Sequence, residues 1–213
     1  MTEHQIAGVF RSGRMVDRRP ESLARWRVTT AAHHTAAGIA LLLGGTPEER
    51  TTGIQSHVEV MTAARSVPIV VEGPEAVTSD LKLWGHAGLI HHCDGIHFLS
   101  PDERIGKLCK CPQSAADRRA QAKSGYGPHP STNIFFRLAD NFFLGVFKFH
   151  STSWLLAENI QNIRNTLLNS HDKVLCELSI ETVEFTPADG GLSMRYRKPA
   201  IKELTPRNEQ STS

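Results

Sequence analysis

The stretch 134–149 reads IFFRLADNFFLGVFKF and contains two runs of alternating apolar residues. Ile134, Phe136 and Leu138 recur at every second position, and a second run covers 146–149. Successive side chains of a β-strand point to opposite faces, so this period of two predicts a pair of strands that each bury one face. The sequence therefore predicts one strand at 134–138 and the next at 146–149.

A helix is expected directly after the two strands. Ser151 or Ser153 can cap it, and its apolar positions follow the four-three-four spacing of one helix face. These positions are Leu156, Ile160, Ile163 and Leu167. Two further strands, 174–185 and 192–198, follow with a Gly-rich turn at 189–191. The order strand, strand, helix, strand, strand predicts an α+β fold of antiparallel sheets with covering helices.

The first half of the chain contains weaker signals of the same kind. Residues 6–16 are expected to form a strand or hairpin that turns at 12–13, and an amphipathic helix is expected to end at Gly44, before a second glycine. The β-branched runs 58–62 and 67–71 are separated by four residues, which is a hairpin spacing. We therefore expect these two runs to pair.

The composition is that of an ordinary globular protein. Of 213 residues, 39% are apolar and 22% are charged, which is enough to bury one core. We expect one globular domain over 1–204 and a disordered tail over 205–213. The sequence has no apolar run of membrane-spanning length and no signal-peptide pattern at its start, so we expect a cytoplasmic protein with no membrane contact.

The charge balance does not favour a nucleic-acid-binding domain. A net charge of +2 is small beside the strongly basic surfaces that follow phosphate backbones. Six arginines do crowd residues 11–27, interrupted by Asp17 and Glu21. A solvated surface explains this pattern, and the alternative is a platform for an acidic protein or for DNA held by another protein.

Three of the four cysteines lie in one stretch that is rich in Gly and Pro. Cys93, Cys109, Cys111 and His129 follow the pattern C-x15-C-x-C-x17-H. Three thiolates and one imidazole form a common donor set for a tetrahedral, structural Zn2+ site. The spacing therefore predicts a zinc-stapled loop region over about 86–131.

Two alternatives remain open for this stretch. The cysteines could be reduced cytosolic thiols, or Cys109 and Cys111 could form a redox-active pair. The fourth ligand is also ambiguous, because His97 lies four residues after Cys93, and His91 and His92 directly precede it. Cys176, in contrast, occupies an apolar position of an alternating strand and is expected to be a buried small hydrophobe.

Residues 114–123 have strong helix formers but are nearly all polar. Such a helix needs an anchor other than a wide apolar face, and flanking metal ligands would provide one. We expect Trp84, Trp154 and Phe147 to be core or sheet-packing residues rather than partner contacts, because their surroundings are apolar.

The sequence contains none of the common catalytic motifs. The sequence lacks a P-loop, a GxGxxG loop, an HExxH helix and a GxSxG elbow, and no acid-base pair stands near the cysteines. A zinc ion with four protein ligands has no open position for water, so a structural role is expected. We therefore expect no enzymatic activity and assign no catalytic residues.

With these elements in place, the sequence resembles the recombination directionality factors that partner with large serine integrases of actinobacterial phages and integrated elements. The resemblance spans most of the chain and is carried by several short blocks. They are Trp26 to Thr29, Gly44-Gly45, Val58 to Thr62, Trp84, Cys93-Asp94-Gly95, Cys109 to Pro112, Arg118-Arg119, Pro130 to Thr132, Phe136 to Leu138, Leu144 to Trp154 and Lys198 to Ile201. One block departs from the family pattern, because His129 stands where members usually have a cysteine.

The resemblance implies a non-enzymatic regulator. Such factors bind the integrase and favour excision between attL and attR over integration between attP and attB. We expect the partner-binding surface to combine the zinc loop, the polar helix through Arg118 and Arg119, and exposed residues of the sheet. DNA contact is expected to be indirect. The alternatives are a zinc-stabilised adaptor for another phage or host protein and a direct DNA-binding module.

Overall fold

The computed structural model describes residues 6–17, 19–52, 55–170, 173–186 and 192–204. Twelve strands and three α-helices make up this part of the chain. In chain order they are β1 (Ile6–Val16), β2 (Arg19–Thr30), α1 (His33–Leu43), β3 (Pro47–Thr52), β4 (Gln55–Met61), β5 (Ser66–Glu72), β6 (Val77–Gly85), β7 (Gly88–Cys93), β8 (Phe98–Ser100), α2 (Ala115–Lys123), β9 (His129–Leu138), β10 (Val146–Ser151), α3 (Trp154–Ser170), β11 (Lys173–Phe185) and β12 (Met194–Glu203). Three short 3-10 helices, η1 (Pro74–Ala76), η2 (Asp102–Arg104) and η3 (Phe142–Leu144), join them.

The strands form one branched sheet. Its main path runs in the order β12-β11-β5-β9-β10-β1-β2-β4-β3, and β6, β7 and β8 branch from β9. The β1–β10 pair is parallel, whereas the other strand pairs are antiparallel. The fold is therefore α+β, as the order of strands and helices in the sequence predicted.

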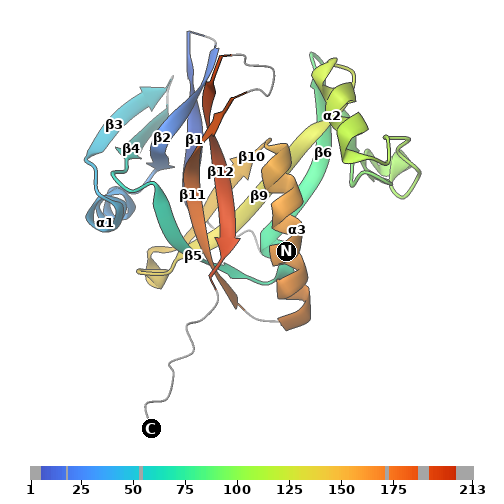
Figure 1. Ribbon diagram of the computed structural model, residues 1–213. Helices are drawn as coiled ribbons and strands as arrows, with labels where there is room; N and C mark the ends of the chain where they lie inside the picture. Colours follow the sequence, from blue (N-terminus) through green and yellow to red (C-terminus); the bar gives the residue numbers. More distant parts are fainter. Residues whose placement is uncertain (1–5, 18, 53–54, 171–172, 187–191, 205–213) are drawn as a thin grey trace.

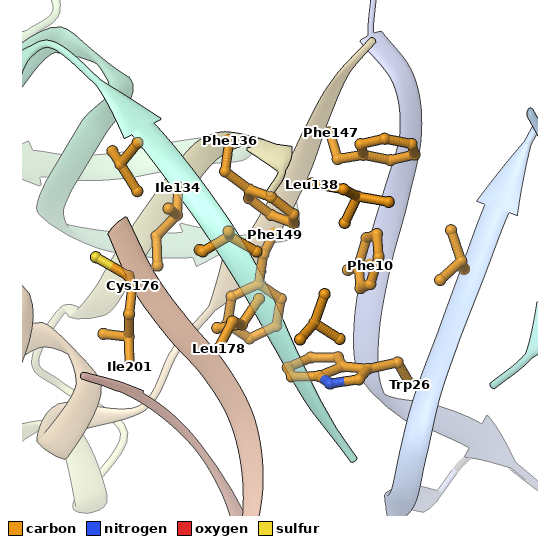
Figure 2. Close-up of a cluster of buried hydrophobic side chains, with 14 of the residues drawn as sticks. Phe10, Trp26, Ile134, Phe136, Leu138, Phe147, Phe149, Cys176, Leu178 and Ile201 are labelled. Atoms are coloured by element: carbon orange, nitrogen blue, oxygen red, sulfur yellow. The ribbon is translucent and has the colours of Figure 1, made fainter. Parts of the chain in front are cut away.

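The sheet curls around its apolar face, and the core lies inside the curl (Figure 2). The indole of Trp26 on β2 donates a hydrogen bond to the Arg65 carbonyl, 3.1 Å away and just before β5. Three strands of the sheet path, β9, β10 and β1, lie between β2 and β5, so this contact spans the interior of the curl. Phe10 packs edge-on against Trp26, Phe136 and Phe147 with ring centroids 5.3–5.9 Å apart.

Helix α3 covers one side of this core. Its apolar face is the stripe predicted from the sequence, and Leu156, Ile160, Ile163 and Leu167 are all buried. The helix packs on β9, β11 and β12. Helix α1 packs on β2 and β4 and ends at Gly44, whose positive φ of 72° favours glycine. Among the described residues, no helix is long and apolar enough to span a membrane.

Residues 6–16 form one strand, β1, which is the first of the two forms expected for them, and they do not turn at 12–13. A register shift between Arg11 and Gly13 interrupts the pairing of β1 with β2. The expected pairing of the runs 58–62 and 67–71 was wrong. Strands β4 and β5 do not pair with each other. β4 lies between β2 and β3, whereas β5 lies between β11 and β9. The expected turn at 189–191 and the tail at 205–213 lie outside the described residues.

The aromatic centre of the core gives a prediction about stability. Phe10→Ala should lower the free energy of unfolding by about 3–5 kcal/mol, because it removes a ring that is 1% exposed and opens a cavity among three other rings. The matched change Phe143→Ala removes a ring that is 96% exposed and should cost less than about 0.5 kcal/mol. Urea unfolding of the three proteins measures both values, and equal losses would contradict this description of the core.

Candidate metal centre

Strand β7 places two donors on the same face. His91 and Cys93 are two residues apart, so the strand period of two turns both side chains the same way. His92 points to the opposite face, where its ring nitrogens lie 3.0 Å from the Ser100 hydroxyl and 3.2 Å from an Asp80 carboxylate oxygen. The alternation thus assigns His91 and His92 to different environments.

The second pair of donors comes from the loop before α2. The backbone N–H of Cys109 donates to the Ile96 carbonyl at 2.8 Å, which fixes this loop against the turn after β7. Lys110 then adopts a left-handed conformation with φ of 60°. In an extended strand the residues on either side of it would lie roughly 6.6 Å apart. The left-handed turn shortens this separation and brings Cys111 back toward Cys109.

The four side chains converge on one point. One ligand atom each from His91, Cys93, Cys109 and Cys111 lie within 4.8 Å of one another. The Sγ atoms of Cys93 and Cys111 are 3.7 Å apart, and His91 Nε2 is 3.5 Å from Cys111 Sγ. A tetrahedron with metal–sulfur bonds of about 2.3 Å has edges of about 3.8 Å. The donor types and their separations therefore fit a metal ion held by three thiolates and one imidazole.

The protonation of these groups follows from their burial. Burial raises the pKa of the Cys93 and Cys111 thiols, because removal from water disfavours the thiolate. Burial also lowers the pKa of His91, and the positive charges of Arg104 and His92 add to this effect. His91 is therefore held neutral, which is the form that ligates metals, whereas the thiols must lose protons on binding.

The turn after β7 is built to present Cys93. The Asp94 carboxylate accepts hydrogen bonds from the backbone N–H groups of Ile96 and His97, each at 2.7 Å. Gly95 has a positive φ of 101°, and a Cβ there would lie 2.8 Å from the Arg118 guanidinium. Asp94 and Gly95 thus form a turn. Position 95 requires glycine because its φ is positive and because a side chain there would collide with Arg118.

Arg118 and Arg119, the predicted partner-binding residues, both contact other parts of the same chain. Arg118 donates to the carbonyls of Pro112 at 2.5 Å and Gly95 at 3.0 Å, so it ties the two donor-bearing segments together. Arg119 donates to the Glu158 carboxylate at 2.7 Å, and its guanidinium lies 5.9 Å from the centre of the Trp154 ring. These contacts hold α2 against the metal centre and against the start of α3.

The histidine that completes the donor set is His91, whereas His129 was expected there. His129 lies outside the group, exposed at the start of β9 and opposite Lys82 of β6. His97 is also outside the group and lies 3.9 Å from the Asp94 carboxylate. His91 could have been identified from its position two residues before Cys93, provided that both residues lie in one strand and so share a face. The number of residues between possible ligands does not show whether they lie in a strand.

Cys176 occupies a different part of the molecule. It is fully buried on β11 in the main core, and burial raises its pKa to about 12. The thiol is therefore neutral at physiological pH and packs as a small apolar side chain, which confirms the expectation from the strand pattern.

The segment around the metal centre exposes many large apolar side chains. We call residues 84–127 the cysteine lobe; Figure 1 places its helix α2 on the opposite side of the molecule from α1. The exposed apolar residues of this lobe are Trp84, Leu89, Ile90, Ile96, Leu99, Ile105, Leu108 and Tyr126. Trp84 was expected in the core, but it is 66% exposed at the end of β6. Such a concentration of exposed apolar side chains is typical of a protein-binding surface.

Comparison with known proteins places this geometry in a family. No solved structure gives a significant match to the chain. A family model described as Gp3-like, recombination directionality factor-like, matches residues 7–191, which include the donor set, α2 and the strands of the sheet up to β11. The chain belongs to the Gp3-like family of recombination directionality factor-like proteins.

Proposed function

We propose that this protein is a non-catalytic directionality factor that binds a large serine integrase in the bacterial cytoplasm. In this role it favours excision between attL and attR over integration between attP and attB. The observation that carries the proposal is the exposed apolar surface of the cysteine lobe, in a chain that belongs to a directionality factor-like family. Protein-binding surfaces typically centre on such aromatic and aliphatic side chains.

The metal in this proposal is a structural Zn2+. Three thiolates and one imidazole are a usual donor set for structural zinc, and four protein ligands leave no position for a reactive water. The ion would link β7 to the loop before α2 and so fix the shape of the exposed surface. Its contribution would be to the folding of the cysteine lobe, and the rest of the proposal involves no chemistry at the metal.

The switch itself must come from differential affinity. A factor that bound the integrase equally well in both synaptic arrangements would not shift the balance between them. We propose that the cysteine lobe contacts the mobile coiled-coil arm of the integrase and binds more tightly when the arm follows the path required for excision. Arg118 and Arg119 act indirectly in this proposal, since they hold α2 in place. The integrase, in turn, brings the factor to att-site DNA.

A second candidate is a zinc-stabilised adaptor for another phage or host protein. The same exposed apolar surface would serve it, so only the partner distinguishes the two functions. Copurification with a protein other than an integrase, together with unchanged recombination in the assay below, would favour the adaptor.

The donor set gives a prediction about metal content. Protein purified without chelators should contain about one zinc per chain, and Cys111→Ser or His91→Ala should lose most of it because three donors remain. His129→Ala and Cys176→Ala should retain the metal. Elemental analysis together with native mass spectrometry measures each protein. Zinc loss from His129→Ala with retention in His91→Ala would assign the fourth position to His129 instead.

The raised pKa values of the Cys93 and Cys111 thiols predict how the apparent zinc affinity changes with pH. Because burial disfavours the thiolates of Cys93 and Cys111, a metal ion must displace their protons, and the apparent zinc affinity should rise with pH. Between about pH 6 and pH 8 we expect an increase of about tenfold or more per pH unit. Competition with a chromophoric chelator measures this, and a pH-independent affinity would exclude the thiols as ligands.

The exposed surface gives a prediction about function. Purified integrase with attL and attR substrates should recombine about five times more in the presence of this protein. The double variant Trp84→Ala/Ile90→Ala should lose most of this stimulation and bind the integrase at least about tenfold more weakly.

Phe143→Ala is the control, because it removes an exposed aromatic ring outside the cysteine lobe. This variant should stimulate excision as the original protein does. Absence of stimulation by the original protein would exclude the directionality role, whereas equal activity of the double variant would exclude the lobe as the docking surface.

A further inference from the structure

The four cysteines of the chain differ in their access to solvent. Cys93, Cys109 and Cys176 are buried, with exposed fractions of 0%, 6% and 0%. Cys111 is only partly buried, although it belongs to the same donor set as Cys93 and Cys109. The susceptibility of a cysteine to oxidation follows its exposure and its thiolate character. A small oxidant that arrives from solvent therefore meets the sulfur of Cys111 before the other three.

The donor set also gives Cys111 the reactive form of its sulfur. Coordinating thiols are deprotonated, so Cys111 is a thiolate whenever the donor set holds a metal ion. The thiolate, rather than the thiol, is the nucleophile in reactions with oxidants. Cys111 thus combines thiolate character with access to solvent, whereas Cys176 has neither, since it is neutral and fully buried in the main core.

Cys93 is placed to react with Cys111. The Sγ atoms of the two residues are 3.7 Å apart, and a disulfide bond of about 2.0 Å requires them to approach by less than about 2 Å. Cys93 ends β7 and Cys111 lies in the loop before α2, so a bridge between them joins the two donor-bearing segments. The alternative bridge, between Cys109 and Cys111, would stay within one loop.

We propose that Cys111 is an oxidation site for hydrogen peroxide and that Cys93 resolves the oxidised product. The Cys111 sulfur attacks one peroxide oxygen, the O–O bond breaks, and the leaving hydroxide takes a proton from solvent, so that Cys111 becomes a sulfenic acid. The Cys93 thiolate then attacks the Cys111 sulfur, the S–O bond breaks, and a second hydroxide leaves in the same way. Two thiolates, one peroxide and two protons thus give one disulfide and two waters.

The bridge removes two of the four donors. His91 and Cys109 remain, and two donors do not complete a tetrahedral site, so a bound metal ion is released. The buried apolar cluster beside the donor set is small, so release of the ion loosens the cysteine lobe. Oxidation then weakens integrase binding and reduces excision, a last step that rests on the function proposed above.

The test uses the full chain, loaded with zinc and then treated with hydrogen peroxide. A chromophoric chelator follows zinc release, and mass spectrometry of unreduced peptides identifies the bridged cysteines. We expect about one zinc ion to be released per disulfide formed, with the bridge between Cys93 and Cys111. A thiol reductant together with zinc should restore the loaded protein. Absence of zinc release, a bridge between Cys109 and Cys111, or oxidation of Cys111 without a bridge would overturn the proposal.

Two matched variants separate Cys111 from its neighbour Cys109. Cys111→His and Cys109→His each keep two thiolates and two imidazoles, which is another donor set of structural zinc sites. Cys111→His should release zinc at least about tenfold more slowly than the original protein, because the accessible thiol is gone. Cys109→His should release it at the original rate and form the same bridge. Equal rates in the two variants would overturn the proposal, and if either variant fails to bind metal, the peptide map of the original protein decides.

Integrase binding by the same oxidised sample separates this proposal from the proposed function. Zinc release and the Cys93–Cys111 bridge together with weaker integrase binding would support both. The same release and bridge with unchanged integrase binding would support the oxidation site and contradict the cysteine lobe as the docking surface.

Discussion

The convergence of His91 and Cys93 from β7 with Cys109 and Cys111 from the loop before α2 is the contact on which the cysteine lobe depends. The lobe has little apolar core of its own. The buried apolar cluster at the donor set consists of Cys93 and Cys109 of the lobe together with Leu81 of β6, and two of these three residues are candidate donors. A segment that cannot bury enough apolar surface needs another source of folding free energy, and metal coordination is the usual one. A metal ion bound by this donor set would stabilise the lobe as aromatic packing stabilises the curled sheet.

Helix α2 connects this centre to the main body through polar contacts. Arg118 ties the helix to the carbonyls of Gly95 and Pro112, one on each donor-bearing segment. Arg119 contacts Trp154, which begins α3 and also packs against the cysteine cluster. The buried stripe of α3 then lies in the main core. A change at the candidate metal centre would thus reach the main core through Arg119, Trp154 and α3. Arg118 and Arg119 therefore have structural roles within the chain.

Local periodicity predicted much of this structure, and its failures have one physical cause. The stripe of α3 and the polar helix α2 depend on residues close in sequence, and both are present as expected. The partners of β4 and β5 depend on strands far away in the chain, so a hairpin spacing could not reveal them. The candidate metal site also combines a feature that the sequence reveals with one that it does not. The three thiols were identified because they cluster in the sequence. The histidine beside them, His91, shares a face of β7 with Cys93, and the number of residues between ligands does not reveal this.

The cysteine lobe is joined to the main core by the sheet itself. It is attached through the β6–β9 ladder, and β9 also pairs with β10, whose Phe147 and Phe149 lie in the main core. A closely packed aromatic core resists deformation, so the sheet would hold the lobe in one direction relative to the rest of the molecule. In the proposed function, a factor that selects between two geometries of a recombinase requires such a fixed direction, because a lobe that turned freely would bind both geometries equally well.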